Sequence, residues 1–500
     1  MYPISYLWRS AQRYPDRVAI HSPEGDLTFR ELADTVCGRA ATLAALDPDD
    51  SSRVGIGAAN SVDHLITLLA VLAAGKVWVP LNPRNGDPEL RRLVEFVEPS
   101  VVFADAEMFG RLSGIACPLY RLEDLEHGER DDSKVLMGPL SVGGIALDRA
   151  QAIKFTGGTT GFPKGVIQPL RAWNANVATQ IHELRLTPDD RYLVAAPITH
   201  GTSTYILPIL GAGGALIFPS YGKPSGLLDA VEQHAATVFF APPTLIFSLI
   251  EEQRRAPRSL KSLRYLVYGG APMRPEQILD AQAVFGPIVC TSFGQTEAPQ
   301  IITFLPPSKM HGENLVSVGR PTLLTQVAIL DKAGQPLPAG EEGEIAVRGD
   351  LVMGGYLNAP DETRKTLVDG WLRTGDAGVV NDKGFLFLRD RIRDVIITGG
   401  FNVYPSDVEV VLSAHPAIAD CSVVGIPDPK WGEAVHAAIQ LRPAMEIDTD
   451  ALISAVKKEL GSVKTPKQVH VFETLPRSPV GKVLKTAVRD EIEKGLAGEH

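Results

Sequence analysis

The sequence lacks the features that mark secreted, metal-clustered or membrane-spanning proteins. Its four cysteines are scattered among 500 residues without a Cys-x-x-Cys pair, so they predict neither a disulfide framework nor a zinc site and favour a reducing compartment. Residues 1–16 contain no basic segment followed by an apolar one, so no secretory signal is expected. The longest apolar stretch, residues 65–74, is too short to span a bilayer and predicts a buried helix. We therefore expect a cytoplasmic protein with no transmembrane segment.

An excess of positive charge is also absent. The 49 Lys and Arg residues face 59 Asp and Glu residues, which gives a net charge of −10 and disfavours a protein that binds nucleic acid over a broad surface. A local basic pocket for a small anion stays compatible with this balance. The 44% of hydrophobic and 22% of charged residues exclude collagen, coiled coil and general disorder. The length favours about two to four domains.

The first half of the chain alternates helical patterns with short β-branched runs, which predicts an α/β fold with parallel sheets. Thr28 and Glu31 have the spacing of a capping box at a helix start. Asp87 is expected to be the N-cap of another helix, with Pro88 at its first position.

Past residue 318 the pattern changes, and short strands between Gly and Asp turns predict a small β-rich unit. A charged run, residues 389–394, then separates this body from a compact α+β module at the C-terminal end. The same run is compatible with the solvated edge of a hairpin, so the charge pattern alone leaves both interpretations open.

The most informative stretch is residues 155–165, a Gly- and Thr-rich segment after an expected strand at residues 152–155. Its four glycines let backbone N–H groups converge on an anion, and its hydroxyls and one lysine add donors and charge. It is not a Walker A loop, because Pro163 precedes the lysine and Gly165 follows it. The alternative is a mobile turn. The residues that we expect to hold a polyphosphate are Thr156, Gly157, Gly158, Thr159, Thr160, Gly161 and Lys164.

This stretch resembles the phosphate loop of the adenylate-forming superfamily, which includes acyl- and aryl-CoA synthetases, peptide-synthetase adenylation domains and firefly luciferase. The family commonly has Ser where Gly157 stands. Further motifs follow in the family's order over nearly the whole chain. The resemblance implies an α/β fold with a large N-terminal domain, residues 1–392, of parallel-sheet α/β subdomains plus a small distorted β-barrel. A small, mobile α+β C-terminal domain, residues 393–500, would follow.

Two motifs resemble the family's nucleotide-binding segments. Residues 269–273, with the small residues Gly270, Ala271 and Pro272, resemble the segment that passes the adenine face. The alternative for this segment is an ordinary strand-to-helix turn.

The other motif, residues 293–297, resembles the family's Tyr-Gly-x-Thr-Glu signature, with Phe293 in place of Tyr and Gly294 after it. A carboxylate at Glu297 suits Mg²⁺ that bridges ATP phosphates, and Thr296 is expected to donate to the α-phosphate.

Residues 371–376 resemble the ribose motif, in which the Asp376 carboxylate accepts both vicinal hydroxyls. Arg391 matches an arginine that also approaches the ribose. Arg393 stands at the family's hinge position, where Asp or Lys is common. Residues 476–482 resemble the C-terminal loop whose lysine, here Lys482, reaches the active site.

The family reaction has two steps: a carboxylate displaces pyrophosphate from ATP to give an acyl adenylate, and a thiol then displaces AMP. The resemblance implies ATP, Mg²⁺ and coenzyme A as ligands. His200 would gate the carboxylate, and Gly400 and Lys430 would contact coenzyme A. The expected acid pocket includes Gly201, Thr202 and Ala241.

The expected pocket wall, residues 202–205 and 239–243, is apolar with hydroxyls and contains no Arg or Lys. It favours a fatty acid first and an aryl or arylpropenoic acid second, and it argues against dicarboxylates and amino acids. A non-catalytic protein that binds ATP or acyl adenylate is the alternative from another class, although it would be expected to lose Lys482, Glu297 or Asp376. The partners are thus a carboxylic acid, ATP and coenzyme A. A homodimer remains open.

Overall fold

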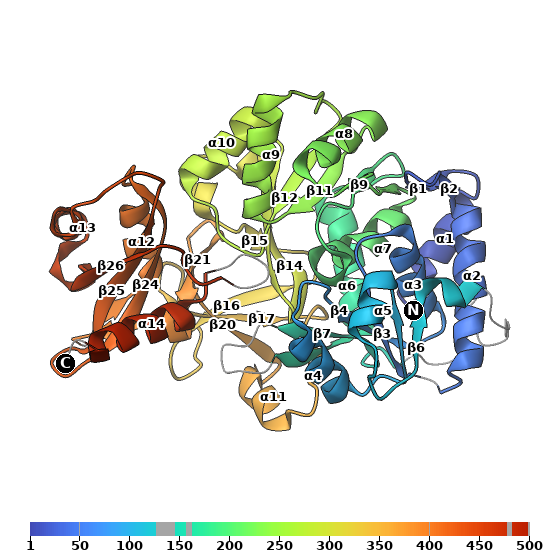
Figure 1. Cartoon of the computed structure of the whole chain (residues 1–500), viewed down its shortest axis with the longest axis horizontal. Coiled ribbons are helices and arrows are strands. Elements are labelled where there is room, and N and C mark those ends of the chain that lie inside the picture. The colour runs from blue at the N-terminus through green and yellow to red at the C-terminus, as the bar shows by residue number, and fades with distance from the viewer. Residues whose placement is uncertain (50, 127–145, 157–162, 400, 478–482, 499–500) are drawn as a thin grey trace. The chain divides into compact units, whose positions relative to one another are not determined.

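The computed structural model describes residues 1–49, 51–126, 146–156, 163–399, 401–477 and 483–498 (Figure 1). The chain forms two compact units. One contains Met1–Val327 with Val347–Arg373, and the other contains Ala328–Ala346 with Thr374–His500. The expected domain boundary between residues 392 and 393 stays a prediction. Among the described residues, no helix combines the length and apolar character needed to cross a membrane. All four cysteines are free thiols.

A seven-stranded sheet forms the first layer of the larger unit. Its parallel strands alternate their side chains between two cores, so that Trp78 and Phe103 face one core while Val79 and Val102 face the other. At one end of the sheet, the strand Lys164–Pro169 runs antiparallel to both of its neighbours, Ala150–Thr156 and Gly355–Tyr356. The strand order is β18 (Gly355–Tyr356), β8 (Lys164–Pro169), β7 (Ala150–Thr156), β4 (Val77–Leu81), β3 (Arg53–Gly57), β5 (Val101–Ala104) and β6 (Leu119–Arg121).

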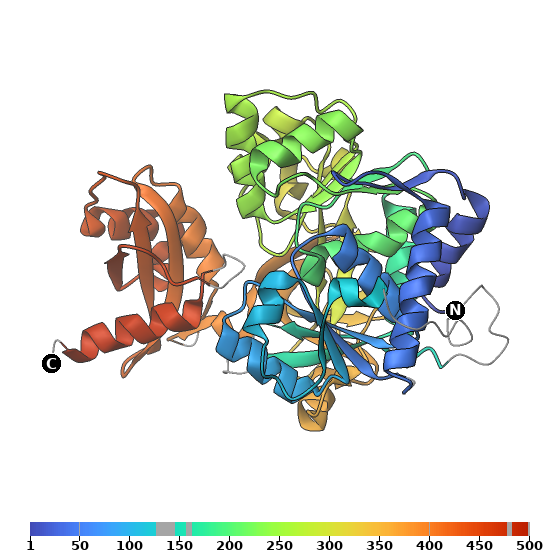
Figure 2. The same ribbon diagram turned by 45° about the vertical axis from the view of Figure 1, so that its right-hand side comes forward.

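Helices cover both faces of this sheet, as a parallel sheet requires. The helices α2 (Phe29–Leu46) and α3 (Val62–Ala73) pack on one face, and α4 (Asp87–Val97) and α5 (Ala106–Arg111) pack on the other. The blue helices in front of the strands in Figure 2 show this layering. The capping box at Thr28 is confirmed. The N-cap of α4 is Gly86, so the expectation of Asp87 was wrong by one residue: Asp87 already has helical geometry, and Gly86 is extended.

A nine-stranded sheet forms the second layer of the larger unit. Strands β1, β10, β9, β11, β12 and β13 run parallel, and antiparallel strands close both edges. The strand order is β15 (Arg320–Pro321), β14 (Ala298–Leu305), β13 (Val289–Gln295), β12 (Tyr265–Tyr268), β11 (Val238–Ala241), β9 (Arg191–Leu193), β10 (Ala215–Ile217), β1 (Val18–His21) and β2 (Leu27–Thr28).

Helices of the second layer lie in two groups. The helices α8 (Pro224–His234), α9 (Pro243–Arg255) and α10 (Pro275–Phe285) lie beside β11 and β12 in Figure 1. The helices α1 (Ser5–Arg13), α6 (Leu170–Glu183) and α7 (Ser203–Ala212) join the core that residues of both large sheets share. Trp78 and Trp173 meet edge to face in this core, with their ring centres 6.2 Å apart.

The remaining strands form two five-stranded sheets. One has the order β16 (Gln326–Leu330), β17 (Gly343–Arg348), β20 (Trp371–Val380) and β19 (Leu367–Val368), with β21 (Leu386–Arg391) paired to β20 and α11 (Pro360–Thr366) before β19. The other has the order β23 (Phe401–Val403), β22 (Ile396–Thr398), β25 (Gly432–Leu441) and β24 (Ile418–Asp428), with β26 (Gln468–Phe472) paired to β25. The helices α12 (Pro405–Ser413), α13 (Thr449–Lys464) and α14 (Lys485–Gly498) accompany this last sheet.

Candidate functional site

Strand topology gathers several of the predicted residues of the larger unit at one edge of the nine-stranded sheet. The strands β9, β11, β12 and β13 are parallel, so their carboxyl ends lie at the same edge, where ligands of open α/β sheets bind. His200 lies in the irregular turn between β9 and α7, and Ala241 is the last residue of β11. Gly270 follows β12, and Phe293 lies near the end of β13. Motifs that are far apart in the sequence therefore meet at one edge.

The predicted phosphate loop connects two antiparallel strands. Thr156 ends β7 and pairs with Lys164, which begins β8, so the chain between them closes a hairpin. The predicted residues Gly157, Gly158, Thr159, Thr160 and Gly161 lie outside the described residues. The structure therefore positions only the two ends of this loop.

Lys164 and Glu297 both contact the segment that contains β18 and α11. The Lys164 ammonium forms an ion pair with Glu362 at 2.7 Å and lies 5.0 Å from the centre of the Tyr356 ring. The Tyr356 hydroxyl donates to the Glu297 carboxylate at 2.9 Å. Burial and the nearby Glu297 carboxylate raise the pKa of Tyr356 above its usual range, so the phenol stays a donor. One short segment thus holds two of the predicted phosphate- and metal-binding side chains.

The donor set fits Mg²⁺ that arrives with a nucleotide. Within the described part of the chain, no group of three His, Cys, Asp or Glu side chains could hold a metal ion by itself. Glu297 offers a single half-buried carboxylate at the predicted position. Mg²⁺ is commonly held by one or two carboxylates together with substrate phosphates and water, so a lone carboxylate fits this mode of binding.

Close strand packing orders the turn around Glu297. A Cβ atom on Gly294 would lie 2.5 Å from the backbone of Gln300, so only glycine allows β13 and β14 to approach here. The Gln168 amide donates to the Thr296 carbonyl at 2.8 Å, and the Glu297 carbonyl accepts from the N–H of Met353 at 2.7 Å. The backbone on both sides of the predicted metal ligand is therefore fixed.

The predicted adenine segment is open on its outer side. Gly270 has φ +81° and is exposed, and a Cβ atom there would meet nothing within 4 Å. Ala271 is half-buried and Pro272 is exposed. Phe293, which replaces the family's Tyr, is buried at 8% exposure. The backbone at Gly270 is therefore open to solvent on this side.

His200 is exposed to solvent, yet its ring is crowded by protein and cations. Desolvation, with Lys154 and Arg84 nearby, lowers the pKa of His200 to about 4. The imidazole is therefore neutral at pH 7. Its Nδ1 lies 3.0 Å from the Thr199 hydroxyl. A neutral ring of such low basicity suits a gate better than a general base.

The predicted acid wall is aromatic and tightly packed. A Cβ atom on Gly201 would lie 2.5 Å from the ring of Phe240, so the glycine makes room for that ring. Phe240 stacks on Tyr205 with their centres 5.7 Å apart. Ala241 is fully buried. Thr202 is also fully buried, and its hydroxyl donates to the Ala196 carbonyl at 2.6 Å.

The predicted ribose residues lie in the C-terminal unit and contact each other. Asp376 and Arg391 are register partners on β20 and β21, and the Arg391 Nε donates to the Asp376 carboxylate at 2.8 Å. Gly375 has φ +68°, and its N–H donates to Glu344 at 3.1 Å. Arg393, the predicted hinge residue, lies 3.6 Å from the Asp394 carboxylate.

Lys430 lies against an exposed aromatic ring. Its ammonium is 4.7 Å from the centre of the Trp431 ring, and the ammonium of Lys467 is 5.3 Å from the same centre. The predicted residues Gly400 and Lys482 lie outside the described residues.

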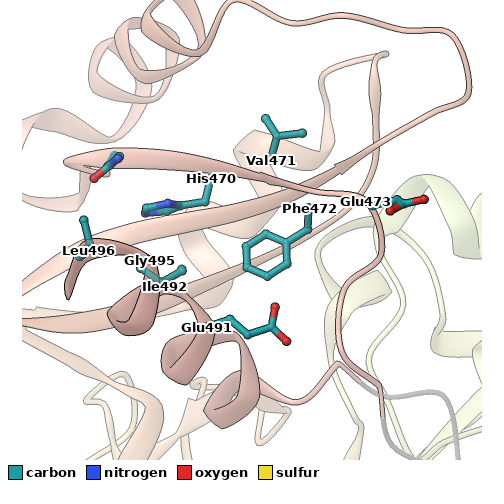
Figure 3. Close-up of a pocket in the computed structure, with 9 residues that line it drawn as sticks. His470, Val471, Phe472, Glu473, Glu491, Ile492, Gly495 and Leu496 are labelled. Carbon is teal, nitrogen blue, oxygen red and sulfur yellow. The ribbon is translucent and has the colours of Figure 1, made fainter. Parts of the chain in front are cut away.

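The C-terminal unit also contains a pocket of about 400 Å³ between β26 and α14 (Figure 3), which His470, Phe472 and Glu491 help to line. None of the predicted site residues lines it.

Sequence reasoning missed several residues of this site. The expected wall contained no Lys or Arg, but the structure brings the charges of Lys154 and Arg84 close to His200. Tyr356 and Glu362 were also missed. A lysine between Ile153 and Phe155, shortly before the Gly-rich loop, is a signal that could have identified Lys154.

Two family models match the chain. The model described as AMP-binding enzyme matches residues 7–357, and the one described as AMP-binding enzyme C-terminal domain matches residues 407–482. Medium/long-chain-fatty-acid–CoA ligase FadD8 of Mycobacterium tuberculosis (strain ATCC 25618 / H37Rv) is 34% identical over 509 residues, which cover 97% of this chain and 89% of that protein. Feruloyl-CoA synthase of Amycolatopsis sp is 35% identical over 483 residues, which cover 96% and 97%.

A solved structure agrees with these matches. The o-succinylbenzoate CoA synthetase MenE from Bacillus subtilis, in complex with its acyl-adenylate intermediate, aligns with a TM-score of 0.88 and 28% identity over 97% of this chain and 98% of that one. The chain belongs to the AMP-binding enzyme family and is an adenylate-forming enzyme. The resemblance and the fold class inferred from the motifs are confirmed.

Proposed function

We propose that this protein is an acid–CoA ligase that converts a carboxylic acid to an acyl adenylate with ATP and then to an acyl-CoA thioester. One observation carries the proposal: Lys164 and Glu297, a cation and a carboxylate in phosphate-binding motifs, are linked to the same segment through Glu362 and Tyr356. Named relatives that ligate fatty and aryl acids to CoA support the second step.

The chemistry needs positioning and charge neutralisation more than a nucleophilic side chain. A carboxylate oxygen of the acid bonds to the α-phosphorus while the bond to the pyrophosphate oxygen breaks. Because anions meet in this step, cations contribute most. In this proposal Lys164 and the loop backbone bind the phosphates, Thr296 donates to the α-phosphate, and Lys482 stabilises the developing charge. Mg²⁺ at Glu297 would neutralise the pyrophosphate.

The nucleotide and the thiol have their own residues in this proposal. Asp376 accepts the ribose hydroxyls while Arg391 holds that carboxylate in place. Lys430 and the exposed Trp431 ring offer a cation and a flat face, which suit the phosphate and adenine groups of coenzyme A.

A fatty acid remains the first candidate for the acid, supported by the apolar wall and by the fatty-acid ligase among the relatives. An aryl or arylpropenoic acid is the second candidate. The stack of Phe240 on Tyr205, with Tyr205 in turn stacked on Tyr192 at 5.0 Å, favours it because a rigid aromatic wall complements a flat ring.

The test is a substrate panel with Mg²⁺–ATP, in the presence and absence of coenzyme A. The acids are saturated fatty acids of increasing length, benzoate and ferulate, and the readouts are pyrophosphate, AMP and thioester mass. We expect acid-dependent pyrophosphate release and one AMP per thioester. ATP binding without pyrophosphate release for every acid would favour the non-catalytic alternative. Thioester formation with ferulate but not with fatty acids would select the aryl candidate.

A further inference from the structure

Lys154 is a buried lysine beneath the His200 turn that the reaction described above does not use. It lies on β7 with 7% of its surface exposed. Its ammonium donates to the Ser203 hydroxyl at 2.7 Å and approaches the His200 carbonyl at 3.4 Å. It also lies 4.9 Å from the centre of the Trp78 ring. The side chain thus connects the strand before the phosphate loop to the turn that holds the predicted gate.

Among the described residues, no carboxylate forms an ion pair with this amine. In the part of the chain that the structure describes, its polar partners are a hydroxyl and a carbonyl, and burial alone lowers the pKa of Lys154 to about 7. Burying an amine without an opposite charge is costly. Such groups cluster where their charge has a role.

The contacts act on the backbone of the gate. His200 has φ −122° and ψ −117°, which breaks the regular helical path. Its carbonyl accepts from the Ser203 hydroxyl at 2.7 Å, and that hydroxyl in turn accepts from Lys154. The bent turn is therefore anchored by the amine, and His200 as a whole residue is exposed.

We propose that Lys154 is a positioning residue for the acid substrate, which anchors the His200 turn and keeps its surroundings electropositive for an incoming carboxylate. The proposal rests on the proposed function, because it assigns a role at the same acid site. In the described part of the chain, Arg84, after β4, and His200 itself also act on this turn, and the Tyr192 hydroxyl, whose pKa is raised by burial, lies 3.5 Å from the Thr202 hydroxyl. His200 is neutral and Arg84 is always charged near pH 7, so Lys154 is the group whose charge changes there.

A pH dependence of acid binding follows. A lysine is charged below its pKa, so the ammonium is present at pH 6 and lost as the pH rises through about 7. Carboxylic acids are already ionised over this range, so a change in acid affinity does not come from the substrate. We expect the KM for the acid to rise about tenfold between pH 6 and pH 9, the effect of one charge at roughly 10 Å in a medium of effective dielectric about 20. The KM for ATP should stay unchanged.

The experiment is acid-dependent ATP–pyrophosphate exchange from pH 6 to pH 9 without coenzyme A, so that no thiol titrates. Lys154→Met removes the charge and keeps the length, and we expect a high, pH-independent KM for the acid. Lys154→Arg keeps the charge at every pH, and we expect a low, flat KM. Ser203→Ala keeps the amine but removes the hydroxyl that accepts from it, so we expect a raised KM whose pH midpoint lies below that of the wild type. Thermal melting and the KM for ATP report whether each variant is folded.

The outcomes separate this proposal from the proposed function. An active wild type whose pH profile and acid KM are reproduced by Lys154→Met would overturn the role of Lys154 alone. Should the Met variant fail to fold, an unchanged acid KM in Ser203→Ala would overturn it equally. A wild type with no acid-dependent exchange for any acid would overturn the proposed function, and the role of Lys154 with it.

Discussion

Asp376 gives the most quantitative test of the proposed nucleotide site. Its carboxylate is largely buried, with 14% of the side chain exposed, and Arg391 binds it at 2.8 Å. The turn before it is fixed, because the backbone N–H of Asp376 donates to Thr374 at 3.1 Å. A ribose would therefore meet a preorganised acceptor. Asp376→Ala should weaken ATP binding without changing how the acid binds.

The size of the effect follows from the hydrogen bonds that are lost. A hydrogen bond to a charged group contributes about 1.5–3 kcal/mol, and a ribose offers two vicinal hydroxyls. Since Arg391 keeps part of the acceptor capacity of Asp376 engaged, we expect a net loss of about 2–4 kcal/mol, a roughly 30- to 1,000-fold rise in the KM for ATP. Asp376→Asn keeps the shape and one acceptor oxygen, so its loss should be intermediate.

The assay compares ATP with 2′-deoxy-ATP in pyrophosphate exchange at a saturating acid concentration. The wild type should discriminate against 2′-deoxy-ATP by about 10- to 100-fold, the value of one charged hydrogen bond. Asp376→Ala should use both nucleotides almost equally, since its acceptor is gone. Circular dichroism and the KM for the acid serve as controls. If the variant discriminates between the two nucleotides as strongly as the wild type, Asp376 does not bind the ribose hydroxyls.

Three further predictions concern the larger unit. Glu297→Gln should raise the Mg²⁺ concentration needed for half-maximal exchange at least tenfold, since one metal carboxylate is lost; normal exchange at limiting Mg²⁺ would contradict the assignment. Gly201→Ala should displace the Phe240 ring, lower the free energy of unfolding by about 1–3 kcal/mol and shift the preference among acids, while the KM for ATP stays unchanged. Denaturant unfolding and the acid panel measure these two effects, and an unchanged acid profile would mean that the acid does not bind beside Gly201. Glu362→Gln should release Lys164 from its ion pair and lower the KM for ATP a few-fold, because this half-exposed pair contributes only about 0–1 kcal/mol; a raised KM would mean that Glu362 holds Lys164 in its binding position.

Local patterns predicted much of the fold. The capping box at Thr28 is set by residues three apart, and the buried helix α3 follows from a continuous apolar run. The motifs did not predict which turns meet; the structure shows it, because the parallel strands β9, β11, β12 and β13 bring their carboxyl ends to one edge. The N-cap of α4 was missed by one residue because Gly86, with no capping side chain, occupies it.

Contacts between residues far apart in the sequence could not be predicted from local patterns. Lys154 bonds to groups 46 and 49 residues away, and Lys164 pairs with Glu362 across 198 residues. No local spacing encodes such contacts, since they arise only when separate strands and helices pack. The sequence could not predict which acid binds for the same reason, because the shape of the pocket wall depends on how the Phe240 ring fills the space at Gly201.

The most direct test of the two-step account measures the half-reactions separately in two variants. In Lys482→Ala, acyl-adenylate formation from ATP should be nearly abolished, while thioester formation from synthetic acyl adenylate and coenzyme A should be spared. Arg393→Pro fixes φ at the predicted pivot, so it should show the opposite pattern if the C-terminal module turns between the steps. Equal losses in both half-reactions for Lys482→Ala would contradict the account and leave Lys482 with a structural role.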